Sequence, residues 1–195
     1  MGYDVATIGN HDFDAGIDGL HKQLPNANFD FVNCNYDWKD TVMEGNVAPY
    51  KVFDRGGVRI GVLGVGLELN GLVPANLTGD TQYIEPISMA NKYAAILKND
   101  ERCDYVICLS HLGYQYDTDK VCDTKLAKAS KNIDLIIGGH THTFLDKPDV
   151  YNNLEGKEVL VNQVGWAGIM LGRLDIVFER SKKRRCIACK NLPIK

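Results

Sequence analysis

Long hydrophobic runs are missing from this sequence of 195 residues, and no apolar segment approaches the roughly 18 residues that a membrane-spanning helix requires. A secretory signal peptide is not indicated either, because Met1 leads directly into the strand-like segment 3–8. With 45% apolar and 24% charged residues, the composition is that of an ordinary globular domain. The sequence therefore predicts one folded domain without a membrane span.

An excess of positive charge is also absent, since 22 Lys and Arg residues face 25 Asp and Glu residues, for a formal net charge of −3. A broad cationic field that could hold nucleic acid or an anionic bilayer is therefore not expected. One basic cluster stands out, at residues 182–185. We interpret it as part of a solvated C-terminal tail, residues 181–195, which follows a domain formed by residues 1–180.

The six cysteines do not form the dense framework of a disulfide-rich domain. Most of them are scattered along the chain and are expected to be small core residues. Cys186 and Cys189 form a C-x-x-C motif near the C-terminus, but no second pair follows it and it does not open a helix. A zinc ribbon or a thioredoxin-like redox site at this motif is only an alternative interpretation.

Short apolar, β-branched segments alternate with segments of helical periodicity. The expected strands are residues 3–8, 29–33, 50–54, 58–64, 104–110, 133–139, 158–164 and 171–179. The expected helices are residues 14–24, 86–99 and 119–130, with a hairpin turn at residues 55–57 and a long surface loop at residues 66–80. Several strands are apolar throughout, which is typical of central strands covered on both faces, so the predicted fold class is α/β.

Four of the five histidines lie immediately after an expected strand. His11 follows the first strand, His111 the fifth, and His140 and His142 the sixth. Ligands collect beyond the carboxyl ends of the strands in α/β sheets, so we expect these side chains to meet in one crevice. Imidazole nitrogens bind divalent transition metals, and the side-chain carbonyl of Asn10 adds a neutral oxygen. The pattern predicts a metal site.

Three motifs follow one another in a recognisable order: Gly9-Asn10-His11-Asp12, then Ser110-His111, then Gly139-His140-Thr141-His142. Together they resemble the second half of the calcineurin-like metallophosphoesterase signature. Residues 9–14, 48–65, 139–144 and 161–176 are similar to the 5′-nucleotidase branch of that family. The resemblance covers nearly the whole chain. It implies a four-layer αββα fold, a β-sandwich flanked by helices, which is incomplete at the N-terminus.

The resemblance also implies a role for each site residue. The metal ligands would be Asn10, His111 and His140 for one ion and His142 for the other. His11, oriented by Asp14, would be the catalytic histidine, and Asp12 would cap the following helix. Two divalent ions, such as zinc or manganese, generate a hydroxide that attacks a nucleotide phosphate in line. His11 would then protonate the leaving oxygen or stabilise its charge, which is typically worth roughly 10²–10⁴ in rate.

The same resemblance exposes a gap at the start of the sequence. The family carries an Asp-x-His strand end and a Gly-Asp strand end before its Gly-Asn-His motif, and no residue before Gly9 matches them. The remaining ligands are neutral, so two divalent ions would place four positive charges in the crevice without an anionic ligand, at a high electrostatic cost. We therefore expect a domain that lacks its first βα units, binds at most one metal and is inactive by itself.

Full-length nucleotidases of this type also carry a second domain that stacks the nucleobase, and a separate nucleoside-binding partner would supply it here. They are typically periplasmic or secreted, so export of the complete protein is expected from the resemblance alone.

Two alternatives come from other functional classes. One is a catalytically inactive α/β module that binds a single metal, a phosphate or a partner subunit. The other is dinucleotide binding at Gly64-Val65-Gly66, but Leu69 occupies the place of the third glycine that this fingerprint needs.

Overall fold

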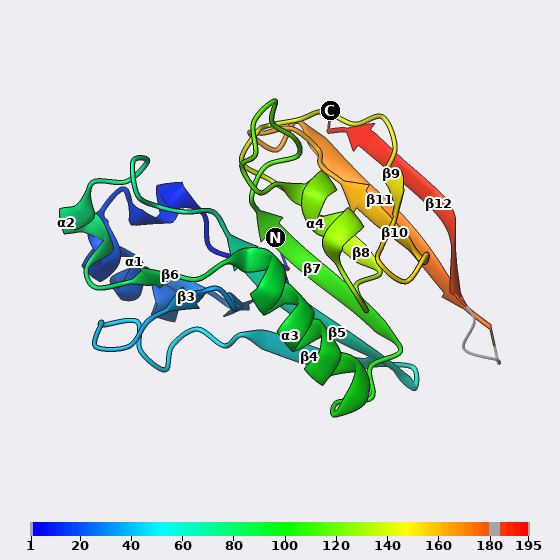
Figure 1. Cartoon of the computed structure of the whole chain (residues 1–195), viewed down its shortest axis with the longest axis horizontal. Coiled ribbons are helices and arrows are strands. Elements are labelled where there is room, and N and C mark those ends of the chain that lie inside the picture. Colours follow the sequence, from blue (N-terminus) through cyan, green and yellow to red (C-terminus); the bar gives the residue numbers. More distant parts are fainter. Residues whose placement is uncertain (1, 180–183, 195) are drawn as a thin grey trace.

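The computed structural model describes residues 2–179 and 184–194, with side chains described as far as residue 179 and again from residue 189. Its centre is a six-stranded sheet in the order β4-β5-β7-β8-β10-β9 (Figure 1). The strands are β4 (Tyr50–Arg55), β5 (Val58–Gly66), β7 (Tyr105–His111), β8 (Leu135–Ile137), β10 (Glu158–Asn162) and β9 (Asp149–Asn152). The four inner strands are parallel, and the edge strands β4 and β9 run antiparallel to their neighbours. All inner strands therefore end at the same edge.

Three two-stranded sheets and several short helices complete the described part of the fold. The small sheets pair β1 (Val5–Ala6) with β2 (Asp30–Phe31), β3 (Tyr36–Asp37) with β6 (Gln82–Tyr83), and β11 (Met170–Phe178) with β12 (Arg184–Pro193). The helices are η1 (Asn10–Phe13), α1 (Gly16–Gln23), η2 (Leu24–Asn26), α2 (Ala75–Thr78), α3 (Pro86–Asn99) and α4 (Asp123–Ala129). Among the described residues, no helix has both the length and the apolar character that crossing a bilayer demands.

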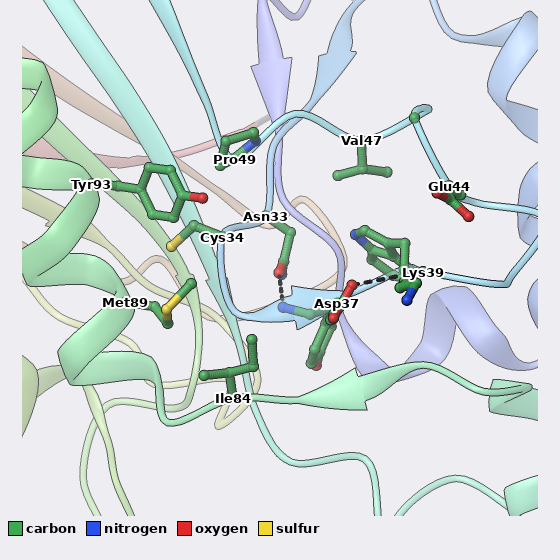
Figure 2. Close-up of a pocket in the computed structure, with 13 residues that line it drawn as sticks. Asn33, Cys34, Asp37, Lys39, Glu44, Val47, Pro49, Ile84, Met89 and Tyr93 are labelled. Carbon is green, nitrogen blue, oxygen red and sulfur yellow. Dashed lines mark hydrogen bonds between the residues drawn. The ribbon is translucent and has the colours of Figure 1, made fainter.

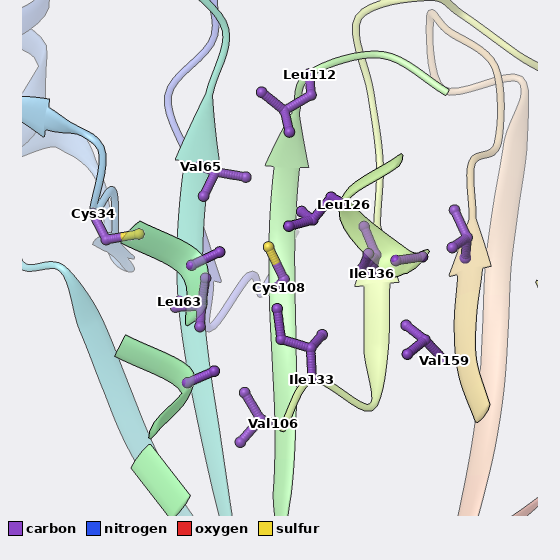
Figure 3. Close-up of a cluster of buried hydrophobic side chains, with 14 of the residues drawn as sticks. Cys34, Leu63, Val65, Val106, Cys108, Leu112, Leu126, Ile133, Ile136 and Val159 are labelled. Atoms are coloured by element: carbon purple, nitrogen blue, oxygen red, sulfur yellow. The ribbon is translucent and has the colours of Figure 1, made fainter. Parts of the chain in front are cut away.

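Helices α3 and α4 cover one face of the central sheet (Figure 1). Helix α3 begins where Glu85 accepts hydrogen bonds from the backbone N–H groups of Ile87 and Ser88, with Pro86 at its first position. Its apolar side chains pack on β5 and β7, while α4 packs over β9 and β10. Figure 3 shows the resulting cluster, in which strand side chains point toward the helices. Each fully buried Leu, Ile or Val contributes about 1.5–3 kcal/mol.

The opposite face of the sheet is contacted by strands. At Gly64 of β5, an added Cβ would overlap the carbonyl oxygen of Val32 and approach the Thr7 hydroxyl, so the β1–β2 region lies directly on this strand. Farther along, the ring of Phe178 in β11 packs edge-on against Tyr105 of β7, with 5.7 Å between ring centroids. The layer order is therefore helices, central sheet, then the β1–β2 and β11–β12 sheets, and the predicted α/β class is confirmed.

Most expected elements are present. The helix predicted at residues 86–99 has the same bounds as α3. The predicted hairpin turn joins β4 to β5, and Gly56 and Gly57 have φ values of +63° and +81°, as a two-residue hairpin loop of mirror-image type requires. Of the cysteines, Cys34, Cys103, Cys108 and Cys122 are free and buried, as expected.

Other expectations need correction. The surface loop at residues 66–80 contains helix α2. The segment expected to form a solvated tail continues the fold instead, because β12 pairs with β11 along its whole length. Lys182, Lys183 and the side chain of Cys186 lie outside the described residues. Cys189 is disulfide-bonded and therefore does not offer a thiolate to a metal.

The close contact at Gly64 generates a stability prediction. Gly64→Ala should destabilise the chain by about 1–3 kcal/mol, because the new methyl group meets rigid backbone at Val32. Gly61→Ala on the same strand is the matched control, since its methyl group meets the flexible end of Leu97. In urea unfolding, the free energy of unfolding of Gly64→Ala should be at least about 1 kcal/mol lower than that of Gly61→Ala. Equal free energies of unfolding for the two variants would contradict the close contact of the β1–β2 region with β5.

Candidate metal centre

Three residues that are far apart in the sequence meet at the carboxyl edge of the central sheet. His111 is the last residue of β7, His140 lies in the loop after β8, and Asn10 begins η1 after β1. The Asn10 side-chain oxygen lies 3.1 Å from Nε2 of His111 and 3.1 Å from Nδ1 of His140. The two imidazole rings are 5.3 Å apart between centroids. One oxygen and two nitrogen donors therefore converge on one point.

This donor set fits a single divalent transition metal. The three ligands are neutral: the two imidazole nitrogens suit ions such as Zn²⁺, and the harder amide oxygen suits ions such as Mn²⁺. Within the ranges that the structure describes, no group of three or more His, Cys, Asp and Glu side chains is placed to hold a metal ion. The candidate site therefore includes Asn10 as its third ligand beside His111 and His140. Among the described residues, no carboxylate completes this site.

The electrostatics of the site favour neutral imidazoles. Burial lowers the pKa of His111 to about 4, and the nearby His140, His11 and His142 add to that shift. The pKa of His140 is also lowered, by burial first and then by Lys120, His142 and His11. Both rings are therefore deprotonated at neutral pH, which is the form that binds a metal. The mutual effects also indicate that all four histidines gather in one region.

His11 and Asp14 form a pair on the exposed side of the site. Nδ1 of His11 lies 3.1 Å from Oδ2 and 3.3 Å from Oδ1 of Asp14, and the two side chains are 78% and 72% exposed. This contact leaves Nε2 of His11 available for another partner. The pair borders a cleft of about 510 Å³ that α1, Phe29 and Phe31 also line.

The turn that carries Asn10 and His11 is held by an aromatic cluster. Phe13 is fully buried, stacks on Trp38 with 6.2 Å between ring centroids and meets Tyr36 edge-on. Tyr36 is positioned in turn by Asn33, whose side-chain oxygen accepts from the backbone N–H groups of Asn35 and Tyr36. Figure 2 shows Asn33 making such a bond at the wall of a cavity of about 280 Å³, which the site histidines do not line.

Asp12 differs from its expected role. Its carboxylate accepts a hydrogen bond of 2.7 Å from the backbone N–H of Gly9, so it caps η1, the turn in which it lies, and not helix α1. The expectation was wrong because a carboxylate at the third position of a helical turn reaches back to the residue before that turn. Gly9 itself is necessary, because an added Cβ would lie 2.6 Å from the His111 ring.

His142 lies beside the three converging residues and packs against an aromatic side chain. Its ring is stacked on Trp166, with 5.8 Å between centroids and 14° between planes. Trp166 is 55% exposed and follows β10. Nothing in the sequence pattern singled it out, since an isolated aromatic residue in a Gly-containing loop carries no functional signal.

The sequence pattern also did not indicate Asp123, a buried carboxylate next to the site. Asp123 is fully buried at the start of α4 and accepts a 2.5 Å hydrogen bond from the Ser110 hydroxyl, next to His111. Burial raises the pKa of Asp123 to about 8, against the opposing effect of hydrogen bonds from Ser110 and Gln163. An added Cβ at Gly138 would overlap this carboxylate. In the sequence, an Asp at the start of a helix resembles a solvated N-terminal charge, which conceals this role.

Comparisons with known proteins identify a family that this chain resembles. Residues 2–144 match the family model of calcineurin-like phosphoesterases. The chain is 29% identical to the trifunctional nucleotide phosphoesterase protein YfkN of Bacillus subtilis, over 92% of the chain and 14% of that protein. It is 28% identical to the snake venom 5′-nucleotidase of Gloydius brevicauda, over 92% of the chain and 32% of that protein.

Among solved structures, a 5′-nucleotidase precursor from Thermus thermophilus superimposes with a TM-score of 0.87 at 29% identity. The superposition covers 98% of this chain and 39% of that one. The chain therefore spans well under half the length of each of these three relatives.

The environment of Asp123 predicts a pH dependence of stability. The pKa of Asp123 is raised in the folded state, so the protonated side chain stabilises the fold. This contribution to the free energy of unfolding is complete below about pH 4 and is lost as the pH rises toward 8. The free energy of unfolding of Asp123→Asn, relative to that of the parent, should therefore increase as the pH rises from 5 to 7. The expected slope is up to about 1.4 kcal/mol per pH unit. Urea unfolding at several pH values measures the difference, and the exposed Asp37→Asn is the control. Parallel profiles for Asp123→Asn and the parent would contradict the prediction.

Proposed function

This chain belongs to the calcineurin-like phosphoesterase family, and we propose that it forms the histidine-bearing part of a metal-dependent phosphomonoester hydrolase of 5′-nucleotidase type. The observation that carries the proposal is the approach of the Asn10 side-chain oxygen to ring nitrogens of both His111 and His140, at 3.1 Å each. Further support comes from the His11–Asp14 pair, which begins only one residue after Asn10.

Asn10, His111 and His140 would hold one divalent ion, and His142 would contribute to a second. Such ions supply a hydroxide nucleophile at neutral pH and offset charge on the phosphoryl oxygens. The chain supports metal binding by keeping its imidazoles neutral, because burial lowers the pKa of His111 and of His140. Protons then compete little with the metal at neutral pH.

His11 would act on the leaving group. Its Nδ1 contacts the Asp14 carboxylate, which would orient the ring and turn Nε2 away from this contact. Nε2 is then the nitrogen that can give a proton to the departing alkoxide of a nucleotide. Because both side chains are exposed, substrate can reach this nitrogen without a rearrangement of the buried core.

The proposed ligand set is incomplete within this chain. All four ligands are neutral, and the two nearest carboxylates in the sequence are engaged elsewhere: Asp12 with the backbone of Gly9, and Asp14 with His11. We infer that the anionic ligands, an Asp-x-His and a Gly-Asp strand end, come from polypeptide outside these 195 residues. By itself the chain would bind at most one metal and would not turn over substrate.

A nucleotide is the proposed substrate class, in keeping with the names of the relatives. The nucleoside would be recognised by a further domain, since this chain matches only 32% of the venom enzyme and 39% of the Thermus structure. Export of the complete protein is proposed on the same similarity, because one of these relatives is a venom protein.

Metal binding to the chain gives the first test. Calorimetric titration with Zn²⁺ should show one site per chain, and His111→Ala or His140→Ala should weaken it at least about tenfold. His21→Ala is the control, because His21 lies on α1 away from the converging donors and its loss should leave affinity unchanged. Equal affinity for all three variants would contradict the assignment of the ligands.

Hydrolysis of AMP gives the second test. When the chain is extended by its preceding polypeptide, Mn²⁺- or Zn²⁺-dependent release of phosphate is expected. His11→Ala should lower kcat by roughly 10²–10⁴, whereas His21→Ala should not change it. Full activity without His11 would refute its catalytic role. Metal-dependent turnover by the 195-residue chain alone would refute its incompleteness.

A further inference from the structure

We propose that Gln163, a buried side chain just after β10, is the positioning residue of the His loop, the segment Gly139–Thr143 that carries His140 and His142. The proposal rests on the proposed function only in treating these two histidines as metal ligands. The hydrogen bonds between Gln163 and the His loop, called the clamp below, form within the chain itself. They fix the loop before any metal binds.

The His loop has a backbone that needs external support. His140 has a φ of +70° and His142 a φ of +54°, so two side-chain-bearing residues within three positions adopt the left-handed region. This region is unfavourable for residues other than glycine, and such conformations persist only where surrounding structure over-determines them. The loop therefore does not owe its shape to local preference.

The Gln163 amide supplies that support through three hydrogen bonds to the same loop. Its Oε1 accepts from the backbone N–H of Thr143 at 2.5 Å and from the Thr141 hydroxyl at 3.1 Å. Its Nε2 donates to the carbonyl oxygen of Gly139 at 2.8 Å. One side chain, only 1% exposed, thus holds the residue before His140 and the residue after His142.

The residues that follow Gln163 extend the clamp along the loop. The backbone N–H of Gly165 donates to the carbonyl oxygen of Thr143 at 2.8 Å, and Phe144 forms a β-bridge with Val164. An added Cβ at Gly165 would overlap the Phe144 ring, so this contact requires glycine. One residue later, Trp166 stacks on the His142 ring. Trp166 is therefore a reporter of the loop conformation.

The residue type at position 163 follows from what it bonds. The Gly139 carbonyl accepts from Gln163 in addition to the backbone N–H of Thr141, while the Thr143 N–H donates to Gln163, and an amide side chain offers both a donor and an acceptor. Glutamate would lack the donor and would add a second carboxylate beside the buried Asp123, which already interacts with Gln163. Asparagine is one methylene shorter and could not keep the same separation from both ends of the loop.

The test compares Gln163→Met with the parent chain by ¹H–¹⁵N NMR and by Zn²⁺ titration. The chain has two tryptophans, so its spectrum has two indole signals, and Trp166→Phe assigns them. Gln163→Met should shift or broaden the Trp166 signal in the metal-free chain and leave the Trp38 signal in place. It should also weaken Zn²⁺ affinity about tenfold to a hundredfold, as loss of an outer partner of metal ligands does.

Val161→Ala is the matched control, because Val161 is fully buried two residues earlier and packs in the cluster beneath the helices, away from the His loop. It should lower stability without changing the Trp166 signal or the affinity. Thr141→Val is a milder second variant for the case in which Gln163→Met does not fold. It removes one of the three bonds to Gln163, together with the bonds of the Thr141 hydroxyl to the Tyr114 N–H and the Thr143 hydroxyl, and should change the Trp166 signal in the same direction.

Unchanged Trp166 signals in the folded Gln163→Met or Thr141→Val chain would overturn the proposal, as would an equal loss of affinity in Val161→Ala. A parent chain that binds no Zn²⁺ would instead contradict the proposed metal site of Asn10, His111 and His140 in this chain, which is part of the proposed function. The metal-free spectra would still decide whether Gln163 positions the loop.

Discussion

The parallel pairing of β5, β7, β8 and β10 is the constraint on which the rest of this structure depends. Parallel strands start and end together, so the segments that leave their carboxyl ends must emerge side by side at one edge. Gly66 pairs with His111, and Leu109 pairs with Ile137 two residues before Gly139. Continued by two residues, this register sets the His loop beside His111. The strands are buried beneath α3 and α4, and this packing holds the sheet edge at which His111 and the His loop lie.

Close backbone approach and buried polar groups then shape the site at this edge. Gly9 allows the His111 ring to lie on the η1 turn, and Gly138 allows the Asp123 carboxylate to lie under the loop that follows β8. A buried carboxyl group is costly, and here it is tied to Ser110 next to His111. The structure thus places unfavourable elements, a buried acid and left-handed histidines, where the candidate ligands converge. Such features are typical of functional sites and are stabilised by well-packed surroundings.

The charge balance of the site explains what this chain contributes and what it needs. Burial keeps His111 and His140 neutral, which suits metal binding, but neutral ligands leave the charge of a bound ion uncompensated. The carboxylates of Asp12 and Asp14 are committed to the η1 backbone and to His11. A complete centre of the proposed kind therefore requires anionic groups from beyond this chain. This agrees with its coverage of only part of each relative.

The sequence by itself determined the elements whose signals are local. Apolar periodicity, with Pro86 at the first position, predicted α3 to the residue, and two glycines predicted the β4–β5 hairpin. The ends of apolar strands indicated Asn10 and the histidines as candidate ligands. The short strands β3, β6 and β9 were not predictable because two to four residues carry little pattern. The pairing of β12 was not predictable because it depends on tertiary contacts, with β11 along the strand and with Asn162 at Asn191. Asp123, Gln163 and Trp166 likewise became visible only in three dimensions. Their partners lie 13 to 24 residues away along the chain, and packing, not local propensity, decides which of these groups meet.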